Sequence, residues 1–287
     1  MPRSRIPNVL SIQSSVVYGH VGNAAAVPAL NRLGIEVWPL DTVRLSNHTG
    51  HPGWRGRPVA AETLAALVEG LAALGALGDC DALLTGYLGT AEMAALVADL
   101  RARVAAERPG AIHLCDPVMG NAARGLYVAE DLPALFRDRL APRADIVTPN
   151  GFELGLLTGR PTVETLEAAI DAAEALRARG PKTVICTSLA APDGGLATLA
   201  ATDDGAWRIV TPRLDAPANG AGDLMAALML GHLLLGRGTA AALARAVSSV
   251  HAVIAASARD GSRDLALIAA ADALAAPPRL FAPEKLR

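Results

Sequence analysis

The feature that most constrains the fold is a regular alternation of short β-branched runs with longer Ala- and Leu-rich segments. The short runs have the length of strands and lie at 9–12, 35–38, 82–84, 112–115, 146–148 and 183–187. Segments of helical length stand between and after them, most clearly at 60–77, 91–107, 163–179 and 224–235. Strands that alternate with helices indicate right-handed β-α-β crossovers. The sequence therefore predicts an α/β fold around a central, mostly parallel sheet.

Two extended runs late in the chain predict an antiparallel edge on this sheet. Residues 195–201 and 206–211 flank Thr202-Asp203-Asp204-Gly205, and Asp-Gly between extended runs is a hairpin signal. The chain beyond them reads as helical and ends in a Pro-rich tail at about 277–287. Neither a linker-like run nor a repeat of fixed period interrupts the sequence, so we expect a single domain over 1–287.

Composition excludes several classes of protein. Hydrophobic residues make up 52% and charged residues 19%, which excludes a disordered chain. The net charge of -2 leaves no basic excess for nucleic acid. The only lysines are Lys182 and Lys285, and no Gly-Lys-Ser/Thr forms a Walker A loop. Cys80, Cys115 and Cys186 have no metal-ligand spacing and are expected to be buried, reduced hydrophobes.

Neither of the two segments that could act as a signal peptide or a membrane span has the pattern that such a segment requires. The N-terminus is basic but is followed by polar residues rather than an apolar signal core. The longest apolar stretch, 224–235, is too short to span a bilayer. We therefore expect a cytoplasmic protein with no membrane partner.

Polar and glycine residues cluster after the strand-like runs. The clusters are Gln13-Ser14-Ser15, Ser46-Asn47-His48-Thr49-Gly50-His51, Thr85-Gly86-Tyr87, Asp116-Pro117, Thr148-Pro149-Asn150 and Thr187-Ser188. Because ligands bind at the carboxyl ends of strands in open α/β sheets, these clusters together outline one site.

A glycine-rich segment, Asn219-Gly220-Ala221-Gly222-Asp223, opens directly into an apolar helical run. Free backbone N–H groups at a helix N-terminus can hold an anion. A carboxylate at the same end fits if Asp223 takes a proton from a nucleophile while the amides hold a transferring phosphoryl group. The pattern is equally typical of a loop with an ordinary first-turn acid, and both interpretations remain open.

Two further acids, Asp116 and Glu153, follow neighbouring strands. Carboxylates at adjacent strand ends can hold Mg²⁺ through water. The alternatives are an Asx-type turn for Asp116 and a capping box for Glu153, whose spacing from Asn150 fits that motif. For Glu153 taken alone, the spacing favours the cap.

Together these motifs resemble the pyridoxal kinases of the ribokinase-like superfamily. The matching pieces follow the family's order from residue 8 to about 255. They are Ser11-Ile12-Gln13-Ser14, Tyr18-Gly19-His20-Val21-Gly22-Asn23, Ser46-Asn47-His48-Thr49-Gly50, Thr85-Gly86-Tyr87-Leu88-Gly89, Cys115-Asp116-Pro117-Val118-Met119-Gly120, Thr148-Pro149-Asn150 with Glu153, Thr187-Ser188, and Gly220-Ala221-Gly222-Asp223. The first three pieces are specific to this branch, and the last is shared across the superfamily.

The resemblance implies a three-layer α/β/α sandwich and ATP-dependent phosphorylation of the 5′-hydroxymethyl group of pyridoxal, pyridoxine or pyridoxamine, giving pyridoxal 5′-phosphate in vitamin B6 salvage. It implies Asp223 as the base, with Gly220, Ala221 and Gly222 as the anion hole. The implied vitamer pocket comprises Ser14, Val21, Thr49, Tyr87 and Asp223. The implied ATP side comprises Asp116, Thr148, Asn150, Glu153, Thr187 and Ser188, with Asp116 and Glu153 toward the metal.

The same resemblance leads us to expect Mg²⁺, a monovalent cation such as K⁺, and a homodimer. It also implies a flap at about 43–57 and a second loop at 212–219 that close over the ligands. Three residues and the length of one segment depart from the family pattern. Ala221 stands where Thr or Val is usual, Asn121 replaces an acid or His, the segment between Arg213 and Asn219 is short, and Thr187 replaces a lysine of some bacterial relatives.

Two other functions remain open. A hydroxymethylpyrimidine kinase has a similar scaffold and phosphorylates a related aromatic alcohol, although the Ser-Asn-His-Thr piece at 46–49 and Tyr87 favour the pyridoxal branch. A vitamer-binding protein without turnover would be expected to lack Asp223 or the glycines before it, and both are present. A pyridoxal-phosphate-dependent enzyme is disfavoured because few lysines could form the aldimine.

Overall fold

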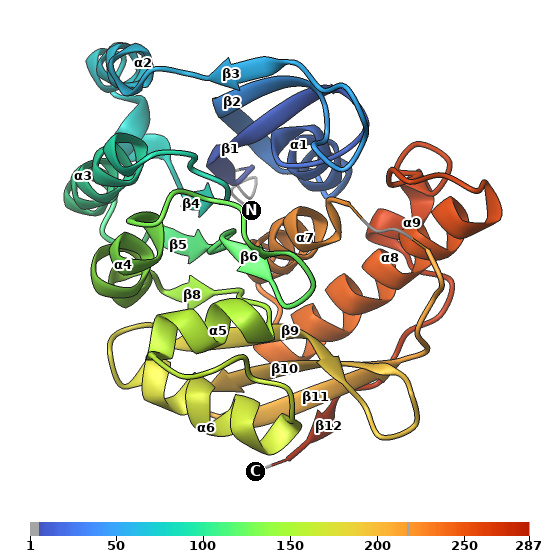
Figure 1. Cartoon of the computed structure of the whole chain (residues 1–287). Coiled ribbons are helices and arrows are strands. Elements are labelled where there is room, and N and C mark those ends of the chain that lie inside the picture. The colour runs from blue at the N-terminus through green and yellow to red at the C-terminus, as the bar shows by residue number, and fades with distance from the viewer. Residues whose placement is uncertain (1–5, 217–218, 287) are drawn as a thin grey trace, which may run out of the picture.

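The structure, a computed structural model, describes residues 6–216 and 219–286. A ten-stranded sheet forms its centre (Figure 1). From one edge to the other the strands are β12 (Glu284–Lys285), β11 (Gly205–Thr211), β10 (Leu196–Thr202), β9 (Thr183–Ala190), β8 (Ile146–Val147), β5 (Ile112–Cys115), β4 (Ala82–Thr85), β1 (Asn8–Tyr18), β2 (Glu36–Asn47) and β3 (Gly56–Pro58). The strands from β9 to β2 are parallel, which confirms the expected parallel centre.

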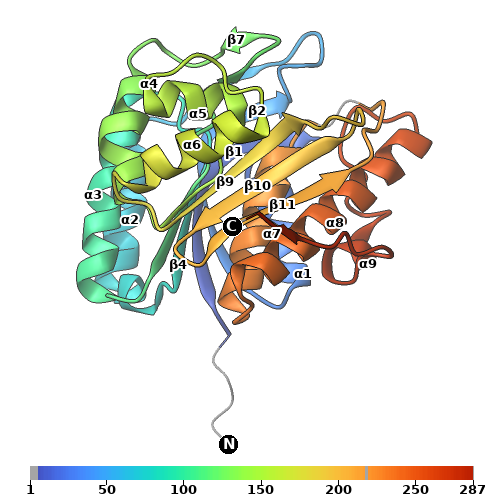
Figure 2. The same ribbon diagram turned by 90° about the horizontal axis from the view of Figure 1, so that it is seen from below.

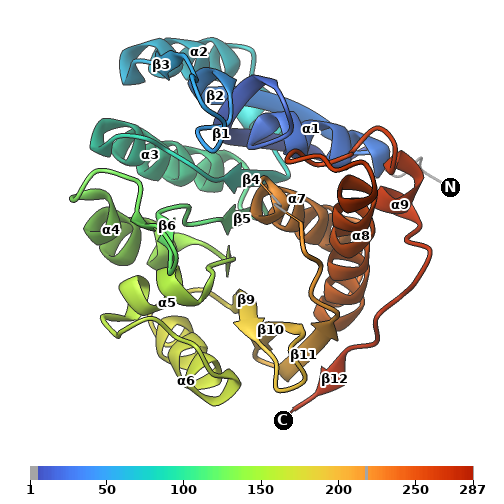
Figure 3. The ribbon, with the colours of Figure 1, turned by 45° about the vertical axis from the view of Figure 1, so that its right-hand side comes forward.

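Helices cover both faces of this sheet (Figures 2 and 3). One face carries α2 (Ala61–Ala73), α3 (Ala91–Glu107), α4 (Leu132–Leu135), α5 (Gly151–Thr158) and α6 (Leu166–Arg177). The other carries α1 (Asn23–Arg32), α7 (Ala221–Leu234), α8 (Thr239–Arg259) and α9 (Ala271–Ala275). Short helical turns span Ala76–Asp79, Phe136–Leu140 and Ala141–Arg143, and β6 (Gly120–Asn121) pairs with β7 (Gly125–Leu126) in a separate hairpin. The three-layer sandwich is confirmed.

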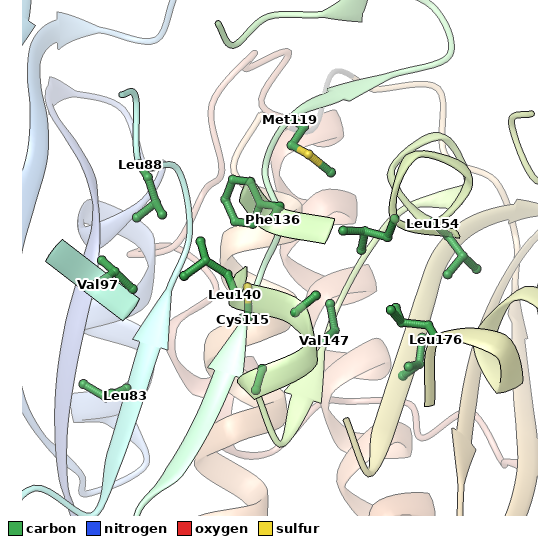
Figure 4. Packing of buried hydrophobic residues seen from close by; sticks show 14 of the residues in the cluster. Leu83, Leu88, Val97, Cys115, Met119, Phe136, Leu140, Val147, Leu154 and Leu176 are labelled. Atoms are coloured by element: carbon green, nitrogen blue, oxygen red, sulfur yellow. The ribbon is translucent and has the colours of Figure 1, made fainter. Parts of the chain in front are cut away.

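A separate hydrophobic core lies on each side of the sheet. Along β1 the side chains alternate, so that Leu10 and Ile12 pack on the α2–α6 face and Val9 packs on the α7–α8 face. Figure 4 shows part of the first core, where Phe136 and Leu140 lie above Cys115 and Val147. A parallel sheet buried on both faces explains why its strands read as continuous apolar runs in the sequence.

The three cysteines are buried and unpaired, as expected. Burial raises the pKa of Cys80 to about 11 and those of Cys115 and Cys186 to about 12. Thiols with such a raised pKa are poor nucleophiles and act as small hydrophobic side chains.

The strands β1 and β2 are longer than their apolar runs predicted. Gln13, Ser14 and Ser15 lie inside β1 rather than after it, and β2 continues through Ser46 and Asn47. Two hydrogen bonds offset part of the cost of burying Gln13: Gln13 Nε2 donates to Ser11 Oγ, and Ser11 Oγ donates to Asn23 Oδ1. Gln13 Oε1 is buried without a hydrogen-bond partner among the described residues. The apolar run that predicted the strand stops at these polar residues, although the strand itself continues.

The sheet has two antiparallel edges where the sequence predicted one. The predicted hairpin is present as β10 and β11, and β12 adds the C-terminal tail to it. At the opposite edge β3 pairs antiparallel with β2 and makes the flap at 43–57 a β-hairpin. No Asp-Gly or Asn-Gly signal marks this second turn.

The helix α8 is long and apolar enough to cross a membrane by length and composition. Half of the relevant stretch is buried, and the helix packs against α7, β10 and β11 as a core helix does. The shorter apolar helix α7 is buried along almost its whole length, which explains its apolar composition.

Candidate active site

The site lies where the parallel strands end and α7 begins. Five strands, β1, β4, β5, β8 and β9, direct their carboxyl ends toward the N-terminus of α7 (Figure 1). The polar clusters of the sequence therefore lie at the carboxyl ends of the parallel strands, where they were expected to outline one site. Two of these clusters lie within strands rather than after them.

The helix α7 begins with an open N-terminus. Gly220 is its N-cap, with a φ of 88°. A Cβ atom there would lie 2.0 Å from the carbonyl oxygen of His20, so only glycine fits. Ala221, Gly222 and Asp223 form the first turn, whose backbone N–H groups have no partner within a helix. This geometry provides the amide donors that an anion hole needs.

Asp223 stands in this first turn and is half-buried. Burial raises the pKa of Asp223 to about 6, and a hydrogen bond from the backbone of Gly22 opposes the rise. A carboxylate with a pKa near 6 is ionised at neutral pH yet basic enough to take a proton. The first-turn acid of the sequence pattern is thus also a potential base.

Asp116 lies beside this turn, directly after β5. Its Oδ2 is 3.9 Å from the position of a Cβ on Gly222. Thr148 Oγ1 donates to Asp116 Oδ1 at 3.1 Å. Burial raises the pKa of Asp116 well above its usual value, the carboxylates of Glu153 and Asp223 push it the same way, and the Thr148 hydrogen bond lowers it. Asp116 therefore belongs to the same electrostatic environment as Asp223.

Glu153 forms the capping box that its spacing predicted. Asn150 Oδ1 accepts from the backbone N–H of Glu153, and Glu153 Oε2 accepts from that of Asn150. Its other oxygen, Oε1, accepts from the N–H groups of Met119 and Gly120 at 3.0 and 3.3 Å. Burial raises the pKa of Glu153 to about 7 despite these three bonds, and Asp223 adds to the rise.

The carboxylates of Asp116 and Glu153, which are buried, and that of Asp223, which is half-buried, form an acidic cluster. Hydrogen-bond donors are what lowers their pKa values, and no Lys or Arg of the described residues contributes. Within the described ranges no three His, Cys, Asp or Glu side chains are placed to cage a metal on their own. Buried oxygen donors without a protein cation suit Mg²⁺ bound largely through water and phosphate.

The remaining residues predicted for ATP lie beside this cluster. Asn150 Nδ2 donates to the carbonyl of Gly120, and Thr187 N donates to the carbonyl of Pro149 at 2.9 Å. Asn150 and Thr187 also form a parallel bridge. Ser188 has a φ of 62°, the only positive φ of a non-glycine among the described residues. The strain accompanies an irregularity of register between β9 and β10, and such strain is commonly found at functional sites.

On the opposite side of Asp223, the residues predicted for the vitamer come from β1 and the loop that follows it. A Cβ on Gly22 would lie 2.0 Å from the carbonyl oxygen of Ser14, and one on Gly220 would lie 3.3 Å from the Cα of Val21. Val21 therefore lies within contact range of Gly220, and Ser14 lies against Gly22, whose backbone donates a hydrogen bond to Asp223.

Tyr87 and Thr49 come from further along the sheet. Thr42 Oγ1 donates to the carbonyl of Tyr87 at 2.6 Å, and a Cβ on Gly89 would touch both the Tyr87 ring and Val43. Thr49 lies in the turn of the flap, next to Gly50. A Cβ on Gly50 would lie 3.3 Å from Asn219 Nδ2, so the flap turn reaches the segment that enters the anion hole.

Two residues in or next to the β6–β7 hairpin were not predicted for the site. Tyr127 follows β7, and its backbone N–H donates to the carbonyl of Met119; the residue is 44% exposed. Partial burial raises the pKa of Tyr127, and the charges of Glu153, Asp116 and Asp223 raise it further, whereas the charge of Arg124 lowers it. Burial and then the charge of Arg124 lower the pKa of His48. In the sequence, the available signal for this region was Arg124, a single basic residue close to Gly120 and Gly125 after the strand predicted at 112–115.

Two of the departures from the family pattern have a structural context. Asn121 Oδ1 accepts from the N–H groups of Ala123 and Arg124 and so shapes the hairpin turn. Ala221 keeps its place in the first turn of α7. The loop at 213–219 includes Pro217 and Ala218, which lie outside the described residues.

Comparison with known proteins agrees with this geometry. Residues 57–266 match the model of the phosphomethylpyrimidine kinase family. A pyridoxal kinase of Rubrobacter xylanophilus is 49% identical over 278 residues, which are 96% of each chain. One of Leifsonia xyli subsp. xyli is 47% identical over 96% of this chain and 98% of the relative. A structure of pyridoxal kinase from Leishmania donovani, in complex with ADP and pyridoxamine, has a TM-score of 0.92 at 32% identity and covers 98% of this chain and 99% of that one.

Proposed function

The chain belongs to the pyridoxal kinase family of the ribokinase-like superfamily, and we propose that it transfers the γ-phosphoryl group of ATP to the 5′-hydroxymethyl group of pyridoxal, and of pyridoxine or pyridoxamine. The product from pyridoxal is pyridoxal 5′-phosphate, as vitamin B6 salvage requires. The observation that carries the proposal is Asp223, held in the first turn of α7 beside Asp116.

In the reaction, Asp223 accepts the proton of the 5′-hydroxyl group as that oxygen attacks the γ-phosphorus. The bond from the γ-phosphorus to the bridging oxygen breaks, and ADP leaves with the electron pair. The N–H groups of Ala221, Gly222 and Asp223 face the charge that develops on the transferring group. Proton transfer to a positioned base contributes about 10²- to 10⁴-fold in rate.

The buried carboxylates fit a divalent cation that arrives with ATP. Asp116 and Glu153 would hold Mg²⁺ through water, and the ion would neutralise charge on the phosphate oxygens. Glu153 already accepts three backbone hydrogen bonds, which hold its carboxyl group in place, and a bound cation would favour the ionised form of this group with its raised pKa. A monovalent cation such as K⁺ is part of the proposal by family resemblance alone.

The two substrates approach from opposite sides of Asp223. Ser14, Val21, Thr49 and Tyr87 form the wall on which the pyridine ring lies, and the flap closes that wall. Thr148, Asn150, Thr187 and Ser188 line the nucleotide side together with Asp116 and Glu153. Closure of the flap and the 212–219 loop excludes water, so that ATP is not hydrolysed in place of the vitamer.

The proposal extends to assembly and location. We expect a homodimer acting in the cytoplasm, with residues 1–287 forming one kinase domain. The continuous ten-stranded sheet supports the single domain, since strands from residue 8 to residue 285 share it.

The direct test is ADP release with Mg-ATP and, in turn, pyridoxal, pyridoxine, pyridoxamine and hydroxymethylpyrimidine, using Asp223→Asn as the control. Turnover on a vitamer that disappears in the variant supports the proposal and ranks the substrates. Turnover on the pyrimidine alone keeps the mechanism and assigns the rival substrate. Vitamer binding without any turnover overturns the kinase and favours a binding protein.

A further inference from the structure

The flap turn makes a hydrogen bond with a segment far away in the chain. His51 Nε2 lies 3.0 and 3.2 Å from the two carboxylate oxygens of Asp264. Because a carboxylate only accepts, the imidazole N–H donates. The side chains are 20% and 11% exposed, respectively, so the pair is largely shielded from water. Such shielding makes it more than a surface contact, which would contribute little.

Asp264 in turn contacts two segments that lead to the proposed base, Asp223: the residue before α7 and the loop after β1. Its backbone forms a parallel bridge with Asn219, the residue directly before Gly220. Its Oδ1 would lie 2.6 Å from a Cβ on Gly19, so the carboxylate packs closely against the loop that carries Val21. Asp264 thus connects the loop that carries Val21, part of the proposed vitamer wall, to Asn219 directly before the anion hole.

The flap turn is itself shaped to make this contact. The backbone N–H of Gly50 donates to His48 Nδ1, and that of His51 donates to the carbonyl of His48. Burial lowers the pKa of His48, and Arg124 and His51 lower it further, which keeps its Nδ1 free to accept. The ring of Tyr18 lies edge-on to His51, with centroids 6.1 Å apart. Thr49 lies inside this turn, between the two histidines.

We infer that His51 and Asp264 form a latch that holds the flap turn against the entrance of the anion hole and thereby positions Thr49 for the vitamer. Both are positioning residues, since they act through Thr49 and Asn219. The inference rests on the proposed function for its kinetic consequence, while the latch itself is a property of the ligand-free protein. Asp116 and Glu153 are at the nucleotide side, so the latch should leave ATP binding unchanged.

The kinetic test compares His51→Ala, Asp264→Ala, the double variant and Asp264→Asn, which keeps an acceptor for the imidazole. Each alanine variant should raise the KM for pyridoxal about three- to tenfold, as expected for one shielded hydrogen bond. The KM for ATP should not change. The double variant should be no worse than the more affected single one, and Asp264→Asn should recover part of the loss. Additive effects, or an equal rise in both KM values, would overturn the latch.

A matched control is the Arg208–Glu284 pair, which joins β11 to β12 at the far edge of the sheet. Arg208→Ala should leave both KM values unchanged. Thermal unfolding of every variant identifies loss of fold. If Asp264→Ala does not fold, His51→Ala and Asp264→Asn decide the question.

Hydrogen exchange in the ligand-free protein separates this inference from the function. Amides of residues 44–57 should exchange faster in His51→Ala than in the wild type, and those of α3 should not. If the wild type phosphorylates no vitamer but this change is seen, the latch stands and the function fails. If the wild type is an active kinase and the exchange is unchanged, the function stands and the latch is wrong.

Discussion

The two sides of the site, which we propose for the nucleotide and for the vitamer, are built in different ways. On the proposed nucleotide side Asp116, Thr148 and Glu153 are at most 5% exposed, and each is fixed by hydrogen bonds. On the proposed vitamer side Thr49 is exposed and Ser14 and Tyr87 are half-buried, while Val21 is buried; the flap is a hairpin outside the cores.

The difference in burial between the two sides follows from the charges that each side carries. Buried carboxylates without a cation are costly in a low-dielectric interior, so they must be held rigidly until a cation and phosphates arrive. The proposed vitamer wall carries no such charge, and we expect its flap, a hairpin outside the cores, to open for the substrate. A rigid charged half and a neutral half with a movable flap would together allow binding without early hydrolysis of ATP.

The strongest way to break the comparison is Asp223→Asn, at the boundary of the two halves. It should reduce kcat by about 10²- to 10⁴-fold, since the general base is lost. The variant should unfold at an equal or higher temperature at pH 7, because a buried charge is removed. Steady-state kinetics and calorimetry measure both. The exposed Asp260, at the end of α8, gives the control Asp260→Asn, which should change neither. Unaltered turnover in Asp223→Asn would remove the base from the mechanism.

The pH dependence tests the charged half. With a pKa of about 6, Asp223 is protonated below that pH and cannot accept a proton. We expect kcat/KM for the vitamer to fall about tenfold per pH unit below 6. Since the folded-state pKa of Asp223 lies above the unfolded value of 3.8, the contribution of Asp223 to the stability of the ligand-free protein should increase as the pH falls from 7 toward 4. Buried histidines with lowered pKa values oppose this trend in the whole protein, so the free energy of unfolding is measured as the difference between the wild type and Asp223→Asn. A difference that does not change over this range would contradict the raised pKa of Asp223.

Asn150→Ala examines the rigidity of the nucleotide half. The change removes the N-cap of α5 and the bond to Gly120, with a loss of about 1 kcal/mol in the free energy of unfolding. The KM for ATP should rise about fivefold and that for pyridoxal should stay constant. Thr165→Ala is the matched control, because Thr165 caps α6 in the same way without touching the acidic cluster. It should lose similar stability with unchanged kinetics; a similar rise in the KM for ATP would show that the effect is not local.

The smallest effect is expected on the neutral half. Thr49→Val keeps the shape of the side chain and removes its hydroxyl group, so the KM for pyridoxal should rise about two- to fivefold. The KM for ATP and the unfolding temperature should not change. Thr63→Val, on the exposed surface of α2, controls for the loss of a threonine hydroxyl. A larger effect on ATP than on pyridoxal would place Thr49 in the wrong half.

Local sequence patterns predicted much of this molecule. The boundaries of α3 coincide with the predicted 91–107, and the Asn150–Glu153 spacing predicted its capping box. The Asp-Gly hairpin formed as expected. The strand predicted at 9–12 is the first part of β1; its continuation to Tyr18 was missed, because polar residues end the apolar run there. The flap strand β3 was missed because Gly56, Arg57 and Pro58 form no apolar run at all.

The sequence by itself determined the alternating fold, the glycine-opened start of α7 and the family, because each depends on residues near one another or on an ordered set of motifs. Only the tertiary structure brought Asp116, Glu153 and Asp223 close enough for their charges to act on one another. The pairing of His51 with Asp264 likewise joins residues 213 positions apart. Burial and charge interaction arise when distant strands meet, and no local pattern of side chains encodes that meeting.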